Sequence, residues 1–287
     1  MAGILLLGGS GILGSEVLKQ LQLDNYEYVA PRSSDLDIRN AESVLTFVND
    51  SKPNWIINCA AWTNVDGAEE ASDQACQLNE AAVSNIAKAA SQFGSKVIHI
   101  STDYVFGGES SKPYLETSDV NPINSYGESK LLGERALLTA IPSAYVVRTS
   151  WLYGVNGKNF VKTISSKAVR GEVANVVDDQ IGSPTSAKDL AIGILSIVKL
   201  APQGGIYNYS NEGSCSWFDF AKAIYKAVGA DPELVKPIPS ASLNMIAKRP
   251  KFSLLSKEKW KSAGLSGVPE WQSSLELVLP EIISSLK

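Results

Sequence analysis

The chain has 287 residues and a formal net charge of −4, with 30 acidic against 26 basic side chains. This balance argues against a nucleic-acid partner or an anionic membrane surface, because either would require a basic patch. Hydrophobic residues make up 44% and charged residues 20% of the chain, which is typical of a globular protein long enough for one large or two smaller folding units.

Cysteine content and hydropathy indicate a cytoplasmic protein. The three cysteines, Cys59, Cys76 and Cys215, are far apart and show no metal-ligand spacing, so we expect a reducing compartment and predict no metal site. The apolar residues 2–7 lack a preceding basic region and run into glycines, which indicates a strand and not a signal peptide. No stretch approaches the roughly 20 apolar residues of a membrane span, so no membrane association is expected.

The first predicted unit is a strand over residues 3–7, followed by a glycine turn and a helix. Gly9, Gly11 and Gly14 fit the spacing GxGxxG, and Gly8, Gly11 and Gly14 fit GxxGxxG. A glycine turn in this context is typical of a dinucleotide site, because it lets the backbone approach the pyrophosphate at the helix N-terminus. We therefore predict a nicotinamide dinucleotide here, and the alternative is a tight turn without a ligand.

The second predicted strand, residues 26–30, ends just before Arg32. An acidic side chain at this place usually binds the ribose 2′-hydroxyl of NAD, whereas an arginine accommodates the 2′-phosphate of NADP. Because Arg32 comes first and Asp35 lies beyond the turn, we expect NADPH, with NADH as the alternative. Asp37 and Ile38 border the adenine, or Asp37 caps the helix that follows.

Two further buried strands are predicted over residues 55–60 and 96–101, with a helix over 72–93 between them. The first of these strands ends in Ala61-Trp62-Thr63, at the carboxyl edge of the sheet, where ligands bind in open parallel sheets. His99 lies between apolar neighbours inside the second strand. A histidine in such a place is more often part of the core than a ligand, so we assign it no role.

A hydroxyl pair and a Tyr–Lys pair follow the fourth strand. Ser101 and Thr102 end the strand, and a long loop of the kind that often forms a lid or a binding loop leads to Tyr126 and Lys130. The tyrosine and the lysine are four residues apart, so both project from one face of the predicted helix. We expect a nicotinamide ring and a ketone to lie beside this face.

The α/β alternation loosens after a fifth predicted strand. The later elements are a helix near 159–170, a strand over 172–177, a helix from Ser186 and a return strand over 205–209. The tail is predicted to be mainly helical, over 217–228, 234–239, 256–263 and 271–287.

These elements predict an α/β protein with a doubly wound, parallel, Rossmann-type sheet and a smaller, mainly helical C-terminal unit. We expect residues 1–150 to bind the dinucleotide, together with a return strand within 186–210. Residues 151–185 and 211–287 are expected to bind the substrate.

Six segments of the sequence resemble the dTDP-4-dehydrorhamnose reductase family, a branch of the extended short-chain dehydrogenase/reductases. They match in order from residue 4 to about residue 191. The segments are Gly8-x-x-Gly11-x-x-Gly14, Ala60-Ala61-Trp62-Thr63-x-Val65-Asp66, Ser101-Thr102-Asp103-Tyr104-Val105-Phe106, Tyr126-Gly127-x-x-Lys130-x-x-Gly133-Glu134, Arg148-Thr149-Ser150-Trp151 and Asp179-Gln180-x-Gly182-x-Pro184-Thr185.

The resemblance implies reduction of the C4 ketone of dTDP-4-dehydro-6-deoxy-L-mannose to dTDP-L-rhamnose, a step that commonly feeds polysaccharide synthesis. It implies that Tyr126, Lys130 and Thr102 are catalytic. It also implies that the sugar nucleotide contacts Thr102, Asp103, Tyr104 and Trp151. The cofactor-lining positions of the family fall on Gly11, Ile12, Leu13, Asp37, Ile38, Ala61 and Thr63.

The sequence departs from the family pattern in two places. The family usually has Arg-Pro, one residue, and then Asn-Ser-Arg-Leu, whereas here Arg249-Pro250 is followed by Lys251-Phe252-Ser253-Leu254. Some members bind magnesium through acidic residues at a dimer interface. Glu16 matches one such position, but the full set is not matched, so the resemblance allows a homodimer and we predict no metal.

The residue types fit the chemistry of ketone reduction, which needs a hydride and a proton. Tyr126 is predicted to donate the proton, and Thr102 to hold the carbonyl oxygen. A free tyrosine titrates near ~10, and an ammonium about 4–6 Å away would supply roughly 3–4 kcal/mol, which is enough to lower the pKa of Tyr126 to about 7.

Three other functions stay open. A reductase of another 4-keto nucleotide sugar would need the same residues. Nucleotide-sugar epimerases share the glycine motif and the Tyr–Lys pair but retain NAD, and Arg32 and the Trp151 segment disfavour them. Some relatives are NADP-binding regulatory subunits, but a pure binding protein has no need of a proton donor such as Tyr126.

Overall fold

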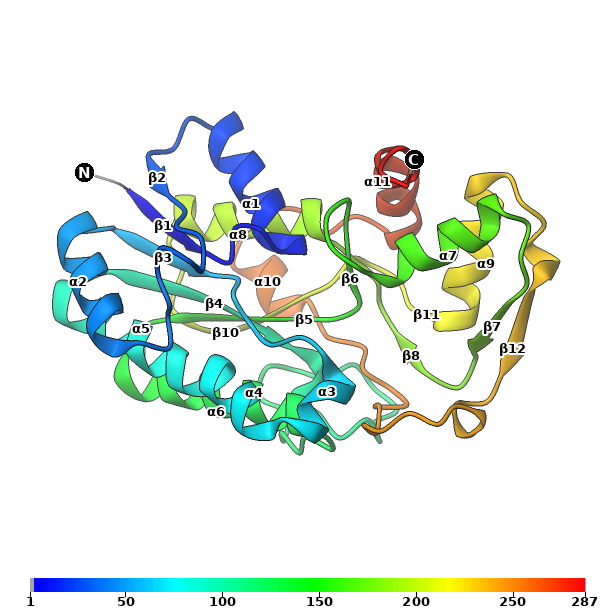
Figure 1. Ribbon diagram of the computed structural model, residues 1–287, viewed down its shortest axis with the longest axis horizontal. Coiled ribbons are helices and arrows are strands. Elements are labelled where there is room, and N and C mark those ends of the chain that lie inside the picture. Colours follow the sequence, from blue (N-terminus) through cyan, green and yellow to red (C-terminus); the bar gives the residue numbers. More distant parts are fainter. Residues whose placement is uncertain (1–2, 287) are drawn as a thin grey trace.

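The structure, a computed structural model that describes residues 3–286, contains a central sheet of six parallel strands (Figure 1). The strands lie in the order β10-β5-β4-β3-β1-β2. The chain therefore starts inside the sheet and winds outward in both directions, as the predicted doubly wound fold requires. The bounds are β1 Ile4–Leu7, β2 Tyr28–Val29, β3 Trp55–Asn58, β4 Lys96–Thr102, β5 Tyr145–Thr149 and β10 Gly205–Tyr209.

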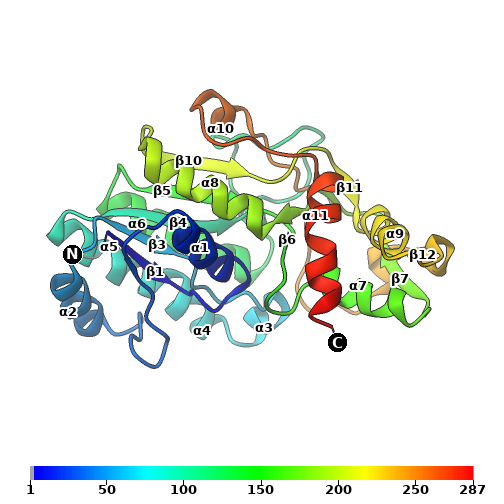
Figure 2. The ribbon, with the colours of Figure 1, turned by 90° about the horizontal axis from the view of Figure 1, so that it is seen from above.

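Helices cover both faces of this sheet (Figures 1 and 2). Strands β1, β3 and β5 are buried along their whole length, which explains why their sequences are largely apolar and do not alternate. One face packs against α1 Ile12–Leu23 and α8 Ala187–Leu200, and the other against α2 Ala41–Ser51, α5 Ala82–Phe93 and α6 Ser125–Ala140.

The long helix predicted before the fourth strand contains a wider turn. Helix α3 Val65–Glu70 comes first, and α4 Ser72–Cys76 then leads through a π-helical turn, Gln77–Ala81, into α5. Such a π-turn inserts one extra residue and often marks a functional position. Here the turn contains Asn79, whose side chain is fully buried.

A second group of elements lies beside the sheet and has its own core, centred on Phe220, Ile224, Trp271 and Leu275. Its strands form three short pairs, β6–β9, β7–β12 and β8–β11. The bounds are β6 Leu152–Tyr153, α7 Phe160–Val169, β7 Ala174–Val177, β8 Ile181–Gly182, β9 Thr185–Ser186, β11 Cys215–Ser216, α9 Trp217–Val228, β12 Val235–Ile238 and α11 Trp271–Ser284.

The prediction of a helix over 234–239 is wrong. Residues Val235–Ile238 form β12, which pairs in parallel with β7. Val235 and Ile238 are β-branched, and Pro237 lacks the N–H that a helix interior needs, so a strand pairing is the better outcome for this segment.

The predicted helix over 256–263 is observed as α10 Glu258–Ser262. Its Trp260 is fully buried and packs with Leu265 in the core of the central sheet. This part of the tail therefore contacts the central sheet, although the sequence places residues 211–287 with the second unit. Within residues 3–286, no helix combines the length and the apolar character that crossing a bilayer requires.

A buried ion pair fixes α6 to the sheet. Glu134 of α6 and Arg148 of β5 are both 2% exposed, and Arg148 Nε and Nη2 donate to the two carboxylate oxygens at 2.9 and 2.6 Å. The Ser101 hydroxyl donates to Glu134 Oε1 at 2.5 Å. Buried charges are tolerated only when they are paired and hydrogen-bonded in this way, so this contact determines where α6 lies.

We expect Glu134→Ala to lower the free energy of unfolding by about 3–5 kcal/mol, because Arg148 would stay buried without a counter-charge. Urea unfolding followed by circular dichroism measures this change. The matched control is Glu172→Ala, which breaks the exposed pair Arg170–Glu172 and should change stability far less. Equal losses in the two variants would contradict the assignment.

Candidate active site

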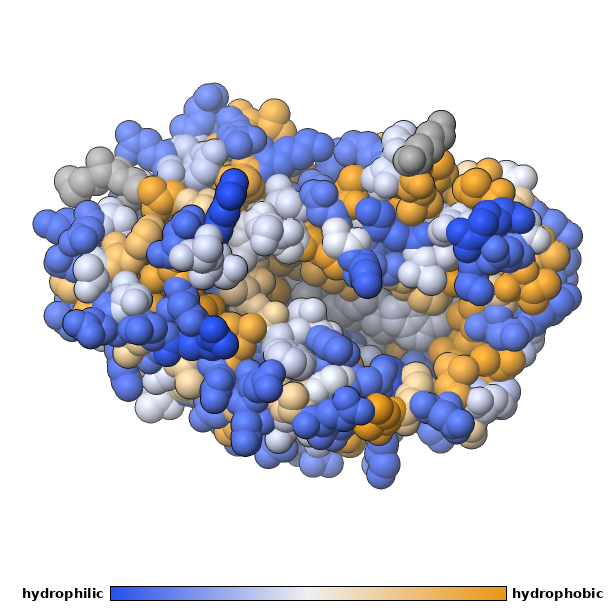
Figure 3. Space-filling model, viewed as in Figure 1, coloured by the Kyte–Doolittle hydropathy of each residue, from blue (hydrophilic) through white to orange (hydrophobic). Residues whose placement is uncertain are grey.

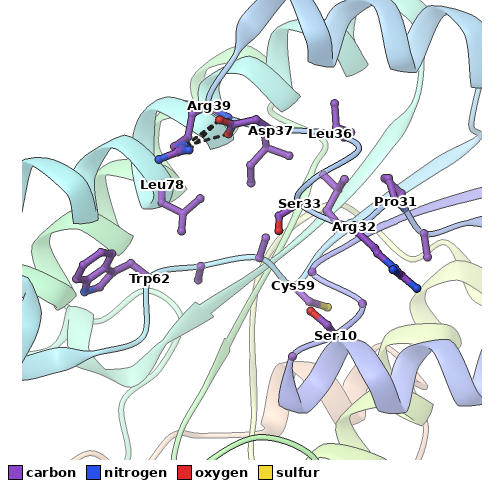
Figure 4. Close-up of a pocket in the computed structure, with 18 of the residues that line it drawn as sticks. Ser10, Pro31, Arg32, Ser33, Leu36, Asp37, Arg39, Cys59, Trp62 and Leu78 are labelled. Atoms are coloured by element: carbon purple, nitrogen blue, oxygen red, sulfur yellow. Dashed lines mark hydrogen bonds and ion pairs between the residues drawn. The ribbon is translucent and has the colours of Figure 1, made fainter.

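A pocket of about 620 Å³ opens at the carboxyl ends of β1 and β3, where the strand order reverses direction (Figure 4). Open parallel sheets bind their ligands at such a switch point. Of the residues predicted to bind the cofactor, those that line this pocket are Gly8, Gly11, Arg32, Asp37, Ile38, Ala61 and Trp62. Those outside this lining are Ile12, Leu13, Gly14, Thr63, Tyr126 and Lys130.

The glycine turn fits a dinucleotide because it leaves no room for side chains. Gly8 has φ +76°, and a Cβ there would lie 2.6 Å from the Ala60 backbone nitrogen. A Cβ on Gly14 would lie 2.0 Å from the Gly8 carbonyl oxygen. Gly11, at the N-cap of α1, offers no side-chain cap, so the first N–H groups of this helix are available to a pyrophosphate.

The charged side chains beside residues 32–39 of the pocket favour a ribose 2′-phosphate over free ribose hydroxyl groups. Asp37 accepts hydrogen bonds from Arg39 Nε and Nη2 at 2.9 and 2.8 Å, and these bonds lower the pKa of its carboxyl group. A carboxylate that is already engaged by a guanidinium is a poor acceptor for ribose hydroxyls. Arg32 and Arg39 both line the pocket, and Figure 4 shows them on opposite sides of it. Sequence reasoning found Arg32 but missed Arg39, which follows Asp37 by only two positions.

The predicted proton donor lies beside the predicted carbonyl-binding hydroxyl. The Thr102 hydroxyl lies close enough to the Tyr126 phenol to lower its pKa. The ring of Tyr126 packs edge-on against that of Tyr104, with centroids 5.7 Å apart. Burial raises the pKa of Tyr126 to about 12, the Thr102 hydroxyl opposes this rise, and the Asp103 charge adds to it.

The start of α6 is held in place by contacts to the loop Ala61-Trp62-Thr63, which follows β3. Asn79, in the π-helical turn, accepts from the Trp62 N–H at 2.8 Å and donates to the Trp62 carbonyl at 3.1 Å. The same Asn79 amide donates to the Ser129 hydroxyl at 2.9 Å, and Ser129 donates to the Tyr126 carbonyl at 2.8 Å. Asn79, which sequence reasoning missed, therefore links the loop 61–63 to helix α6, which carries Tyr126.

Lys130 is buried, and its environment differs from the one that we expected. Its Nζ donates to the Ile100 carbonyl at 2.6 Å and lies 3.2 Å from His99 Nε2. Burial lowers the pKa of Lys130 to about 8, against the charges of Glu134 and Cys59. An amine with this pKa is still mostly protonated at pH 7, and it loses its charge as the pH rises through about 8. Together with the raised pKa of Tyr126, this contradicts the expected fall of the phenol pKa to about 7.

Asp103 is the most strongly perturbed carboxyl group of the site. It is 2% exposed, and its Oδ1 accepts from the Thr102 hydroxyl at 3.0 Å. Burial raises its pKa to about 7, and the nearby hydroxyl groups of Ser253 and Thr102 oppose this rise. Its Oδ2 is buried and makes no close hydrogen bond to the described residues. A substrate hydroxyl would satisfy this oxygen.

A second cavity, of about 860 Å³, lies between residues 107–110, in the loop after β4, the loop of Asp179 and Gln180, and tail residues within 240–252. Figure 3 shows that the molecule is also hollowed between the central sheet and the second unit. The cavity is lined by the motif residues Asp179 and Gln180 and by Lys251 and Phe252, of which Phe252 stands where the family usually has Asn.

Arg249, which also lines this cavity, links the tail to helix α3. Its Nη1 and Nη2 donate to the two oxygens of Asp66 at 3.0 and 2.7 Å, and Nη1 also donates to the Ala247 carbonyl at 2.8 Å. Trp151 has φ +47° and stacks on Trp217, with centroids 3.7 Å apart. The structure places Trp151 in this stack and outside the lining of the cavity. Its contact with the substrate stays a prediction.

Comparison with known proteins gives consistent results. The family described as RmlD substrate binding domain matches residues 1–283. A dTDP-4-dehydrorhamnose reductase of Aggregatibacter actinomycetemcomitans is 40% identical over 96% of this chain and 98% of its own length. A dTDP-4-keto-6-deoxy-D-glucose reductase of Streptomyces niveus is 36% identical over 96% of both chains. The solved dTDP-4-dehydrorhamnose reductase of Bacillus anthracis, in complex with NADP, is 37% identical, with a TM-score of 0.94 over 98% of this chain and 100% of that one.

We expect Gly14→Ala to weaken dinucleotide binding by more than about tenfold, or about 1.4 kcal/mol, because the new methyl group must displace the Gly8 backbone. Fluorescence titration with the reduced dinucleotide measures the affinity. Gly267→Ala is the control, since a Cβ at that position meets no atom within 4 Å. Unchanged affinity in Gly14→Ala would show that the turn does not contact the ligand.

We expect stability to depend on pH through Asp103. Its folded pKa, about 7, lies above the value of roughly 3.9 for a free aspartate, so the folded protein loses stability as pH rises between these values. The loss amounts to at most about 1.4 kcal/mol per pH unit. The Asp103→Asn side chain stays neutral at all pH values. The free energy of unfolding of this variant, measured with urea, should therefore rise relative to that of the wild type as the pH increases over this range. A stability difference that does not change with pH would contradict the prediction.

Proposed function

The chain belongs to the RmlD substrate binding domain family, and we propose that it is an NADPH-dependent reductase of a dTDP-4-keto sugar. The substrate that fits best is dTDP-4-dehydro-6-deoxy-L-mannose, which is reduced at C4 to dTDP-L-rhamnose. The observation that supports this most is the proximity of the Tyr126 phenol to the Thr102 hydroxyl, which lies at the carboxyl edge of the sheet and donates to the buried carboxyl group of Asp103.

The reaction needs two groups to reach the ketone from different sides. NADPH, when bound, supplies the hydride. The Thr102 hydroxyl holds the carbonyl oxygen, and Tyr126 donates a proton to that oxygen as negative charge develops on it. With a pKa of about 12, Tyr126 is protonated before the reaction, as a proton donor must be. The transfer is favourable because an alkoxide is a much stronger base than a phenolate.

Other residues position the reactants. Lys130 binds the ribose next to the nicotinamide, and the free Oδ2 of Asp103 accepts a sugar hydroxyl. Tyr104 and Trp151 contact the sugar nucleotide. The cofactor rests on the glycine turn and on the loop Ala61-Trp62-Thr63. These roles follow the family's motif positions, and the burial of Lys130 and Asp103 supports them.

The choice of cofactor follows from the two arginines. Arg32 and Arg39 line the pocket where the adenosine ribose would lie, and Asp37 is engaged by Arg39. A 2′-phosphate gains charge-assisted hydrogen bonds from such groups. NADPH is therefore preferred, and NADH is the slower alternative.

The rival functions differ in what they retain or consume. An epimerase would keep NAD through each turnover, whereas a reductase must release NADP⁺. A regulatory subunit would bind NADPH without consuming it. The neighbouring hydroxyl groups of Tyr126 and Thr102 favour a catalyst over a binding protein, because neither hydroxyl is needed to bind the dinucleotide.

We also propose the organisation and surroundings of the protein. Residues 1–150 with 186–210 would bind NADPH, and residues 151–185 with 211–287 would bind the nucleotide sugar. The free cysteines Cys59, Cys76 and Cys215 support a cytoplasmic location. The match of Glu16 to a dimer-interface position supports a homodimer, which light scattering after gel filtration would test.

We expect Tyr126→Phe to lose about 10²- to 10⁴-fold in turnover and to keep its affinity for NADPH, because the variant lacks only the proton donor. Absorbance of NADPH measures turnover, and fluorescence titration measures binding. Near-normal turnover would refute the role of Tyr126.

The substrate class is tested by the same absorbance assay with the wild type, over a panel of 4-keto nucleotide sugars with both NADPH and NADH. We expect the dTDP-linked 4-keto-6-deoxy sugars to be consumed fastest. No consumption with any member of the panel would refute the reductase proposal. NAD that co-purifies with the protein and is never released would favour the epimerase.

A further inference from the structure

The buried histidine of β4 contacts the lysine of the reduction site. His99 is 0% exposed, Asn58 and Lys130 are each 1% exposed, and the three side chains form one row beneath the site. Asn58 Nδ2 lies 3.1 Å from His99 Nδ1, and His99 Nε2 lies 3.2 Å from Lys130 Nζ. Because no water reaches this row, each atom must find its hydrogen-bond partner inside it.

The direction of these hydrogen bonds is determined at one end. The Ala60 N–H donates to Asn58 Oδ1 at 3.1 Å, so the oxygen of the amide faces Ala60 and its NH₂ group faces the histidine. His99 Nδ1 must therefore accept. A neutral imidazole carries one proton, which then lies on Nε2 and points at Lys130. The doubly protonated ring is disfavoured because burial and the charge of Lys130 hold the pKa of His99 well below its usual value.

An N–H that points at Lys130 matters because an ammonium has no lone pair. A neutral Lys130 amine can accept from His99 Nε2–H while it donates to the Ile100 carbonyl. A charged Lys130 would face the same N–H as a second donor. To relieve that conflict, the Asn58 amide would have to rotate, and its NH₂ group would then face the Ala60 N–H.

We propose that His99, oriented by Asn58, is a positioning residue of the reduction site that presents an N–H to Lys130 and so favours the neutral amine. The proposal rests on the proposed reductase function only for its catalytic consequence. That consequence is that the charge of Lys130, and with it the ease of proton transfer from Tyr126, depends on a hydrogen-bond chain that touches neither cofactor nor substrate.

Other titratable groups near the amine act in a different way. Cys59, at the end of β3, and Glu134, one turn further along α6, both raise the pKa of Lys130. Tyr126 lies one turn before it on the same helix face. The influence of these three residues on Lys130 is the same in both orientations of the Asn58–His99 hydrogen-bond chain. The effect of reversing the chain can therefore be separated from the effect of the surrounding charge.

The first test needs no substitution, because His99 is the one histidine of the chain. Protein labelled with ¹⁵N-histidine gives one pair of ring resonances, whose shifts distinguish the two tautomers and the charged ring. Above pH about 8, the pKa of Lys130, we expect Nε2 to carry the proton and Nδ1 to have none. A proton on Nδ1, or a charged ring, would overturn the proposal.

The second test reverses the direction of the hydrogen-bond chain by replacing a single donor group with an acceptor. Asn58→Asp replaces the NH₂ group by an acceptor, which moves the proton to His99 Nδ1 and leaves a lone pair facing Lys130. In ¹³C-lysine-labelled protein, with the Lys130 signal assigned through Lys130→Met, we expect the titration midpoint of Lys130 to rise by at least about one pH unit, or about 1.4 kcal/mol.

A double-mutant cycle separates this effect from the direct attraction of the new carboxylate. His99→Phe keeps a ring of similar size and removes both nitrogens. In that background we expect Asn58→Asp to raise the midpoint by less than half as much. Equal rises in the two backgrounds would show that only the charge acts, and would overturn the proposal.

Kinetics connect the chain to the reaction. We expect the Lys130-dependent limb of the pH profile of kcat for NADPH oxidation to move with the NMR midpoint in Asn58→Asp. If this limb of the kcat profile stays in place while the NMR titration midpoint of Lys130 moves, the proposed effect of the hydrogen-bond chain on catalysis is overturned. Failure to reduce any keto sugar would refute the reductase function, but the tautomer of His99 is measured without substrate and does not depend on it.

Discussion

The buried pair Glu134–Arg148 is the constraint on which the reduction site depends. Glu134 follows Tyr126 and Lys130 at intervals of four residues, so all three lie on one face of α6. Arg148 anchors that face to β5, and Ser101, at the end of β4, adds a short hydrogen bond. A charge pair buried this deeply has one acceptable geometry, because any displacement leaves a charge unpaired in the core. Tyr126 and Lys130 are thus held in register with the sheet edge.

Much of the fold could be predicted because its signals are local. The continuous apolar runs at β1 and β3 and the glycine spacing from Gly8 to Gly14 each reflect a contact made within a few residues or with a neighbouring strand. At Gly14 the physical reason is plain, since any side chain would overlap the Gly8 carbonyl. The Tyr126–Lys130 spacing was informative for the same reason, since positions four apart share a helix face.

What the sequence could not provide depends on residues that are distant along the chain. His99 reads as a core residue from its apolar neighbours, and only the fold brings Lys130 and Asn58 against its ring. The pKa of Tyr126 depends on burial, which a spacing does not reveal, so a calculation from the lysine charge alone gave the wrong direction. The strand at Val235–Ile238 exists because β7 lies beside it, some sixty residues earlier in the chain.

The path of the chain has a consequence for how such proteins can diversify. Strand β10 pairs with β5 only after the chain has passed through part of the second unit, and the tail then returns Trp260 to the core of the sheet. A fragment that ended at residue 150 would expose the outer edge of β5, an open template for aggregation. The second unit is therefore inserted into the sequence of the central sheet and is not a separate terminal domain. New specificities would have to arise by substitution within its loops, and exchange of the whole unit would break the sheet.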